Sequence, residues 1–407
     1  MGEARSDLRH VDGPSNVAAG LHIRANVPGH DGRRLTAMDA ILAIDANAGG
    51  VNFQLFSVRG EGRLERHIKG RLDGLGRHPR LRASRANGDP LAHRTYQNDD
   101  VDDIPAACAV VDSWLRDELG IQPLAVGHRV AHGGPDDARP ALIDDAVMAR
   151  LERLIALAPQ LQPYNLAPIR IMQANHPALP QVACFDTAFH LGTVVENGSY
   201  PIAHQLCAGD ARRYGAHGLC YESIARALTL EAPEIAARRV IVACLDDTSS
   251  MCALKEGRSV ESTNGFYASG ASPSDYSAGE IDAGDAFLLT NPGDDGAAAR
   301  FLRAEQAVEH LAYCAGLNAG LLAAALEGLD AFVFTGAIGQ GSTAIRARIA
   351  ERLSWLGAIL DAKANAHNAR LISRRDSRIP LYVLPSDDEL TIARHTLALL
   401  LNGPSPR

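Results

Sequence analysis

The stretch AILAIDANAGGVNFQLFSV, residues 40–58, decides the fold class of this chain. Its two apolar runs, Ile41–Ile44 and Val51–Val58, have the length and composition of β-strands. The residues between them, 46–50, are small and glycine-rich, as tight turns require. The stretch therefore predicts a β-hairpin, and a similar pair of runs within residues 239–254 predicts a second one.

Helical patterns and further strand-like runs alternate along the rest of the chain. Apolar runs predict strands at 123–130, 181–185, 331–335 and 381–384. Helical spacing predicts helices at 105–119, 146–157, 305–326, 342–356 and, with Asp387 as its N-cap, up to residue 401. Two hairpin-plus-helix halves predict a duplicated α/β architecture with a cleft between two domains.

The composition excludes several classes of protein. The 407 residues are 46% apolar, enough for a large core, and 48 acidic against 40 basic residues argue against a nucleic-acid binder. Seven cysteines without a C-x-x-C pair indicate a reduced, cytoplasmic protein. The longest apolar stretch, 311–326, is too short and too interrupted to cross a membrane.

Residues 1–37 differ from the rest because they show neither helical nor alternating apolar periodicity. They are interpreted as a disordered tail or as a consequence of a translation start that really lies at Met38. We favour the second interpretation, because a compact domain would begin naturally at Met38. No apolar segment follows Arg33 and Arg34, so a secretory signal is not predicted.

A glycine-rich segment, 336–342, follows a predicted strand and opens a predicted helix. Gly336, Gly339 and Gly341 would let backbone N–H groups approach a nucleotide phosphate or ribose. Their spacing differs from the dinucleotide fingerprint. A tight strand–helix turn without a ligand is the alternative.

Arg129 stands just before the Gly133–Gly134 pair, at the end of a predicted strand. A guanidinium there can hold an anion in a bidentate manner, although a surface arginine beside a turn is the alternative. His128 and His132 are four residues apart, but the segment is not predicted to be helical, so they do not indicate a metal pair.

Asp186 and His217 are two further candidates. Asp186 ends a predicted strand between aromatic residues and could position a nucleophile or a metal-bound water; a structural cap is the alternative. His217 lies between glycines and could donate a hydrogen bond to a developing negative charge, although a lone histidine is usually structural.

Taken in order, these segments resemble those of acetate kinase and the related propionate and butyrate kinases. The matching segments are HRVAHGG (128–134), LAPI (166–169), QVACFDTAFH (181–190), RRYGAHG (212–218), KEGRSVES (255–262), FTGAIGQGS (334–342) and LPSDDELTIAR (384–394). With the first hairpin they span residues 41 to about 395. The resemblance implies a two-domain fold of the acetate and sugar kinase/actin type, built from duplicated ribonuclease-H-like domains.

It also implies the domain bounds: 38–190 with 390–407 as an N-terminal kinase domain, and 191–389 as a C-terminal nucleotide-binding domain. The implied reaction converts ATP and a small carboxylate such as acetate into ADP and an acyl phosphate, with Mg²⁺, in a homodimer. The implied roles are: catalysis by Asp186 and His217; carboxylate binding by Arg129; nucleotide binding by Gly336, Gly339, Gly341, Asp247 and Thr248; metal binding by Asp45 and Asp388.

The chain departs from the family pattern at several positions. Asp45 stands where the family has asparagine, and Asn52 stands where it has a phosphate-side lysine. A shorter loop alignment would put Asn47 on the family's asparagine, but the lysine is still missing. Other departures are Cys244–Thr248 in a phosphate loop, Asp275–Ser277 in place of an arginine segment, a shortened 281–305, Arg170 after LAPI, and Gln340–Gly341.

Because a lost phosphoryl-side cation costs about 10²–10⁵ in rate, these departures predict an impaired or altered kinase, unless Arg170 replaces a cation. Two alternatives stay open. One is a catalytically inactive relative that binds a ligand or partner. The other is a different carboxylate-binding enzyme that uses Asp246 and Asp247 without ATP.

Overall fold

The structure is a computed structural model, and it describes residues 39–135, 137–191, 214–246, 249–263 and 297–402. Side chains are described throughout these ranges except at 61 and 297–307. The predictions for residues 1–37, for Asp247 and Thr248, and for 275–277 lie outside the described residues. The described residues all belong to one compact unit.

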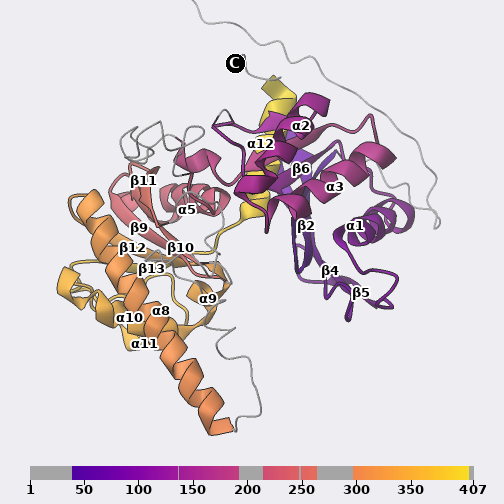
Figure 1. Cartoon of the computed structure of the whole chain (residues 1–407). Helices are drawn as coiled ribbons and strands as arrows, with labels where there is room; N and C mark the ends of the chain where they lie inside the picture. The colour runs from indigo at the N-terminus through magenta and orange to yellow at the C-terminus, as the bar shows by residue number, and fades with distance from the viewer. Residues whose placement is uncertain (1–38, 136, 192–213, 247–248, 264–296, 403–407) are drawn as a thin grey trace, which may run out of the picture. The chain divides into compact units, whose positions relative to one another are not determined.

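Within the described residues, eight strands form a first sheet in the order β5-β4-β3-β2-β1-β6-β8-β7 (Figure 1). β1 pairs in antiparallel fashion with β2 and in parallel fashion with β6. The strands are β1 (Ala40–Asn47), β2 (Gly50–Arg59), β3 (Arg63–Asp73), β4 (Arg80–Arg85), β5 (Pro90–Thr95), β6 (Ala125–Val130), β7 (Ala141–Leu142) and β8 (Gln181–Phe185).

The second sheet repeats the topology of the first. Its described strands are ordered β11-β10-β9-β12-β13, and this matches the order β3-β2-β1-β6-β8 strand for strand. β9 is antiparallel to β10 and parallel to β12, as β1 is to β2 and β6. The duplicated architecture is therefore confirmed. The strands are β9 (Arg239–Cys244), β10 (Ser250–Lys255), β11 (Arg258–Ser262), β12 (Ala331–Thr335) and β13 (Leu381–Val383).

Helices cover both faces of each sheet. On the first sheet, α1 and α3 pack against one face and α12 against the other. On the second, α8 and α10 take one face and α5 the other. The longer helices are α1 (Ile104–Ser113), α2 (Asp145–Arg153), α3 (Gln162–Asn175), α5 (Gly218–Glu231), α8 (Ala297–Ala325), α10 (Thr343–Arg352) and α12 (Asp388–Asn402).

Short helical segments connect these elements. They are η1 (Gly60–Gly62), a π-helical turn η2 (Trp114–Glu118), η3 (Leu154–Leu157), η4 (Ala188–His190), α6 (Pro233–Ala236), α9 (Gly336–Gly341), η5 (Ser354–Leu356) and α11 (Ala362–Ala366).

The core of the first sheet follows from alternation along its strands. Phe53 points to the α1 face, where it is fully buried and packs edge-on against Trp114, with the ring centroids 6.0 Å apart. Ile41 and Phe56 point to the opposite face, beneath α12. Truncating a buried phenylalanine such as Phe53 to alanine costs about 3–5 kcal/mol of stability.

Several predicted helix boundaries are correct. The Ser342 side chain accepts a hydrogen bond from the Ile345 N–H at the start of α10, and Asp387 accepts one from the Leu390 N–H at the start of α12. The predicted helix at 342–356 is shorter, because a 3₁₀ turn follows Leu353. Likewise, the predicted helix at 105–119 changes to π geometry at Trp114.

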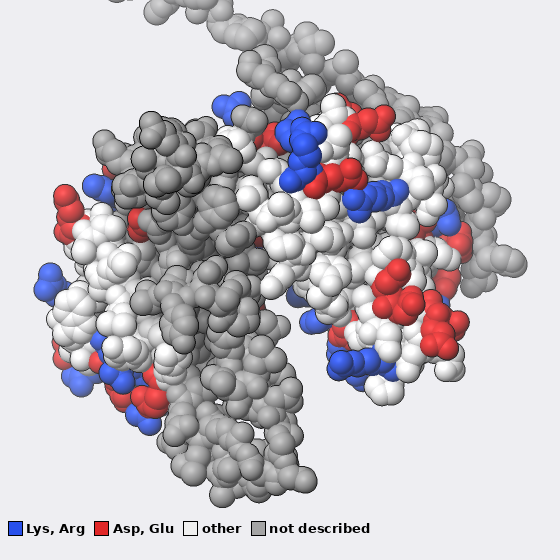
Figure 2. Space-filling model, viewed as in Figure 1, with Lys and Arg blue, Asp and Glu red and all other residues white. Residues whose placement is uncertain are grey.

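Figure 2 shows how charged side chains are distributed on one face of the molecule. In Figure 2 the basic and acidic side chains drawn on this face are interspersed, without a large field of one sign. Among the described residues, no helix is long and apolar enough to cross a membrane.

Candidate active site

Arg129 lies at the carboxyl end of β6, and two aspartates hold its guanidinium. Its Nε and Nη2 both contact Asp186 Oδ2 at 2.7 Å, and its Nη1 donates to Asp45 Oδ2 at 3.2 Å. Asp186 directly follows β8, and Asp45 lies near the end of β1. Because β1, β6 and β8 are adjacent parallel strands, their carboxyl ends bring these three side chains together.

The ends of these strands are tied to α3. Asn165 donates from its side-chain amide to the Ala46 carbonyl at 2.7 Å and accepts from the Ala131 N–H at 2.9 Å. Gln162 makes the equivalent contact one residue further on, accepting from the His132 N–H at 3.0 Å. All of these groups are buried, so the backbone on both sides of Arg129 has little freedom.

A third carboxylate approaches from α12. Asp388 is the first residue of that helix, and its charge acts on Arg129 together with those of Asp186 and Asp45. Burial opposes the Arg129 cation, but the three acidic neighbours outweigh that effect and raise the pKa of Arg129. Burial and the charges of Glu389, Asp186 and Asp45, only partly opposed by Arg129, raise the pKa of Asp388 to about 8.

Two carboxylate oxygens in this group have no hydrogen-bond partner among the described residues. They are Asp45 Oδ1 and Asp388 Oδ1, and both are buried. A buried carboxylate oxygen without a partner costs free energy. Carboxylate oxygens are the ligands that Mg²⁺ prefers, so this donor set fits a hard divalent cation. The described residues hold no group of three or more metal-ligating side chains that would form a complete protein cage.

His217 joins the site from the start of α5. It is the N-cap residue of that helix and has left-handed backbone dihedrals, φ +57° and ψ +26°, which is uncommon for a residue with a side chain. Its Nδ1 lies 2.7 Å from Ser250 Oγ, and Ser250 Oγ lies 2.5 Å from the Tyr221 hydroxyl. Burial and the Arg129 charge lower the pKa of His217 to about 4.

A close approach at Gly218 links His217 to Asp186. The Gly218 N–H donates to the Asp186 carbonyl at 3.0 Å, and a Cβ on Gly218 would lie only 2.0 Å from that oxygen. Only glycine fits there. The start of α5 is therefore fixed against the residue that holds Arg129.

Comparison with known protein families identifies the family of this chain. The family model for the acetokinase family matches residues 40–291 and 297–394, which is most of the chain. The chain belongs to the acetokinase family. A relative from Nitrobacter hamburgensis named acetate kinase is 53% identical, with 90% of this chain and 98% of the relative aligned. A second relative with that name, from Rhizobium meliloti, is 44% identical over 89% and 99% of the two chains.

Solved structures agree with this acetokinase fold. A propionate kinase from Francisella tularensis superposes with a TM-score of 0.72 at 24% identity, covering 88% of this chain and 99% of that chain. The acetate kinase of Porphyromonas gingivalis gives 0.69 at 24% identity, covering 89% and 100%. At this identity the likeness supports the fold alone. The predicted acetate and sugar kinase type of fold is confirmed.

Four of the predicted site residues are brought together: Asp45, Arg129, Asp186 and Asp388. His217 is close enough for the charges of Arg129 and Asp186 to affect its pKa. The predicted roles of all these residues stay predictions. Asp247 and Thr248 lie outside the described residues.

The glycine segment lies at the end of β12, where it forms the short helix α9 directly before α10. Gly336 has φ +79°, and a Cβ there would lie 2.3 Å from the Leu245 carbonyl oxygen. That carbonyl accepts from the N–H groups of Ile338 and Gly339, and Asp246 Oδ2 accepts from that of Ala337. Three amides of the segment therefore have protein partners, and nucleotide binding by Gly336, Gly339 and Gly341 stays a prediction.

His128, His132 and Arg170, which the sequence also singled out, lie in structural settings. His128 is buried against the Gln181 side chain at 2.8 Å, and burial lowers the pKa of His132 to about 4. Arg170 lies on α3 in an exposed ion pair with Glu152 at 2.8 Å. The structure therefore gives no support to Arg170 as a replacement cation in the site.

Sequence reasoning missed the residues that support the site. Glu389 accepts from the Gln54 side-chain amide at 3.0 Å, and Arg66 binds both Gln54 and Asp387. Glu389 lies beside Asp388 in the quoted motif, and that adjacency was an available signal. Ser250 and Tyr221 carried no sequence signal, because neither lies in one of the segments that match the family.

Proposed function

We propose that this protein transfers the γ-phosphoryl group of ATP to acetate, giving acetyl phosphate and ADP. An acetate oxygen forms the new bond to the γ-phosphorus, and the bond from that phosphorus to the β–γ bridging oxygen breaks. Membership of the acetokinase family and the names of its close relatives support the substrate class. The observation that carries the proposal is the partly buried Arg129, held by Asp186 and Asp45.

To react, acetate requires a positively charged group that binds it, and it does not require a base that deprotonates it. With an ordinary carboxyl pKa near 4, acetate is already ionised at pH 7, so Asp186 has no proton to remove. Arg129 uses Nε, Nη1 and Nη2 in its contacts with the aspartates, and Nη1 and Nη2 each carry a second N–H. A guanidinium fixed in this way can bind a carboxylate with defined orientation.

The aspartates act through position. Asp186 orients Arg129 through its side chain and the start of α5 through its carbonyl, which accepts from the Gly218 N–H. Asp45 and Asp388 would hold Mg²⁺ through their partnerless oxygens. When bound, the metal ion neutralises charge on the transferring phosphoryl group.

His217 would act as a neutral hydrogen-bond donor. With a pKa near 4 its imidazole is uncharged at pH 7. If Tyr221 donates to Ser250 and Ser250 donates to His217 Nδ1, the imidazole hydrogen is on Nε2. A fixed donor of this kind stabilises negative charge that develops during the reaction.

The proposal includes MgATP as the phosphoryl donor, a homodimeric assembly and a cytoplasmic location. Six cysteines among the described residues are free thiols, which supports a reducing compartment. The assembly is supported by the family resemblance alone.

The test is acyl phosphate formation by the full chain, trapped as the hydroxamate, from MgATP with acetate, propionate or butyrate. We expect turnover with acetate, and Asp186→Asn to lower it about 10³-fold, because Arg129 then loses its main charged partner. Asp330→Asn is the matched control, because it breaks an ion pair with Arg239 in the second sheet. Absence of turnover from folded wild-type protein would favour the inactive, ligand-binding alternative.

A further inference from the structure

A row of polar side chains crosses the first sheet at the level of Arg129. The strand register places Asn52 opposite Asp45, Arg71 opposite Asn52, and Arg82 opposite Arg71. Directly opposed residues of antiparallel strands point to the same face, with Cβ atoms about 4.5–5.5 Å apart. Arg129 ends the row, because it binds Asp45 at 3.2 Å.

This row lies on the face of the sheet that α12 covers. Gln54, two residues after Asn52 on β2, binds Glu389 of α12 at 3.0 Å. Lys69 is opposite Gln54 in the register, and its charge acts on Glu389. Arg71 is two residues from Lys69 and so points to this same face. The opposite face carries the apolar core with Phe53 and Trp114.

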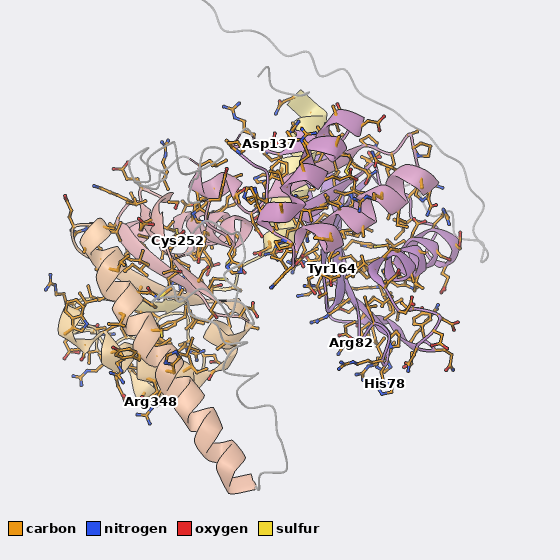
Figure 3. The ribbon with its side chains drawn as sticks, in the orientation of Figure 1. His78, Arg82, Asp137, Tyr164, Cys252 and Arg348 are labelled. Atoms are coloured by element: carbon orange, nitrogen blue, oxygen red, sulfur yellow. The ribbon has the colours of Figure 1, made fainter. Side chains whose placement is uncertain are left out.

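Arg71 and Arg82 are held as a pair. Asp73 contacts Arg71 Nε at 3.2 Å and also binds the Arg82 guanidinium. The two arginine side chains are each 53% exposed, and Arg82 is labelled on β4 in Figure 3. Two guanidinium groups share one carboxylate, so the trio carries a net charge of about +1 at pH 7.

The trio lies beside the turn that ends the β1–β2 hairpin. Asp73 is opposite Gly50 in the register, and Gly50 has φ +145°. A Cβ on Gly50 would lie 2.1 Å from the Leu72 carbonyl oxygen, so the turn packs directly on β3. The positive charge is therefore fixed next to the turn that leads into Asn52, the position at which the family has its phosphate-side lysine.

We propose that Arg71, ordered by Asp73 and paired with Arg82, binds the phosphoryl group of the substrate. It supplies, from the neighbouring strand, the positive charge that Asn52 does not. A guanidinium suits this task because it offers several N–H donors to phosphoryl oxygens. The inference rests on the proposed function and adds a residue that the acyl phosphate or the nucleotide would contact.

The first experiment compares Arg71→Gln with Arg94→Gln in the full chain. Arg94 is a matched control: it lies on β5 opposite Leu81, on the other face, in an exposed ion pair with Glu118. We expect Arg71→Gln to lower kcat/KM for acetyl phosphate with MgADP about 10²-fold. The KM for acetate stays within about twofold, because acetate has no phosphoryl group. If Arg71→Gln lowers kcat/KM for MgATP by a similar factor, Arg71 contacts the nucleotide. If kcat/KM for MgATP is unchanged, Arg71 contacts the acyl phosphate.

A rescue variant separates charge from structure. Adding Asn52→Lys to Arg71→Gln restores a cation on the adjacent strand, so we expect at least about tenfold recovery of kcat/KM. Arg82→Gln leaves Arg71 with Asp73 alone and is expected to lose only a few-fold. The proposal is overturned if Arg71→Gln behaves like Arg94→Gln, or if the KM for acetate changes equally and Asn52→Lys rescues nothing.

A binding measurement keeps this inference apart from the proposed function. Calorimetric titration with inorganic phosphate tests the cation without any turnover. Weaker phosphate binding by Arg71→Gln than by Arg94→Gln supports the inference even if wild-type protein makes no acyl phosphate. Equal phosphate binding by the two variants contradicts it.

Discussion

The two sheets share one topology but differ at the ends of their central strands. In the first sheet the row is charged and runs from Arg129 through Asp45 to Asn52. In the second sheet the corresponding row is small and neutral, with Thr335 beside Cys244 and Cys244 beside Ser250. In each sheet the N-terminus of one helix meets the row.

The helices whose N-termini meet these rows also differ in the charge of the side chain that they bring. α12 brings the carboxylate of Asp388 to the charged row, and α5 brings the neutral imidazole of His217 to Ser250. A duplicated backbone therefore does not fix the chemistry of a strand end; the side chains at a few positions do. On this account the charged row holds the ions, and the neutral row positions one hydrogen-bond donor.

The largest expected effect within the neutral row comes from His217. Replacing it with asparagine removes the Nε2 donor, and we expect kcat to fall about 10²-fold with little change in the KM for acetate. Steady-state kinetics of acyl phosphate formation measure this. If His217→Asn raises the KM for acetate and leaves kcat unchanged, His217 binds substrate as Arg129 does. The proposed difference between the charged row and the neutral row would then be wrong.

Asp388 tests the charged row from the side of α12. Asp388→Asn keeps the shape of the side chain but removes a carboxylate oxygen that suits Mg²⁺. We expect the Mg²⁺ concentration for half-maximal activity to rise about 10- to 100-fold. Asp376→Asn, in an exposed ion pair with Arg374, is the control. An unchanged Mg²⁺ requirement would show that Asp388 holds no metal.

The smallest expected effect is on stability and involves the histidine next to Arg129. Burial lowers the pKa of His128 to about 4. Between pH 6.5 and 4 the unfolded chain binds a proton there that the folded chain does not, so stability falls as the pH falls through this range. From pH 6.5 to 5 this amounts to about 1.6 kcal/mol for one histidine.

His128→Gln should therefore flatten the loss of urea stability between pH 6.5 and 5. His78→Gln, at an exposed histidine, is the control for losing an imidazole. An unchanged pH dependence in His128→Gln would contradict the assigned cause. The variant would then show that other buried groups, such as His132, dominate the acid response.

The sequence predicts the parts of the fold that have strong local signals. The apolar runs at 41–44 and 51–58 lie within β1 and β2, because both strands are buried almost throughout. The strands β3 and β4 were not predicted, because their exposed positions carry arginine and lysine and leave little apolar pattern.

The site was predictable only in part for a related reason. Arg129, Asp186 and Asp388 belong to recognisable segments, and the parallel strands bring two of them together. The position of Arg71 opposite Asn52 depends on strand register, which includes an irregularity between Leu55 and Phe56. Register over such a bulge is a property of the packed sheet and has no local sequence signal.

The most direct test of the account is ATP formation from acetyl phosphate and MgADP by the full chain, with wild-type, Arg129→Lys and Arg239→Lys protein compared. Lysine keeps the charge at 129 but cannot contact Asp186 and Asp45 together through a planar fork. The account predicts ATP formation by wild type and Arg239→Lys, and a loss of about 10²–10³-fold in Arg129→Lys. Equal rates in all three proteins would contradict the central role of Arg129.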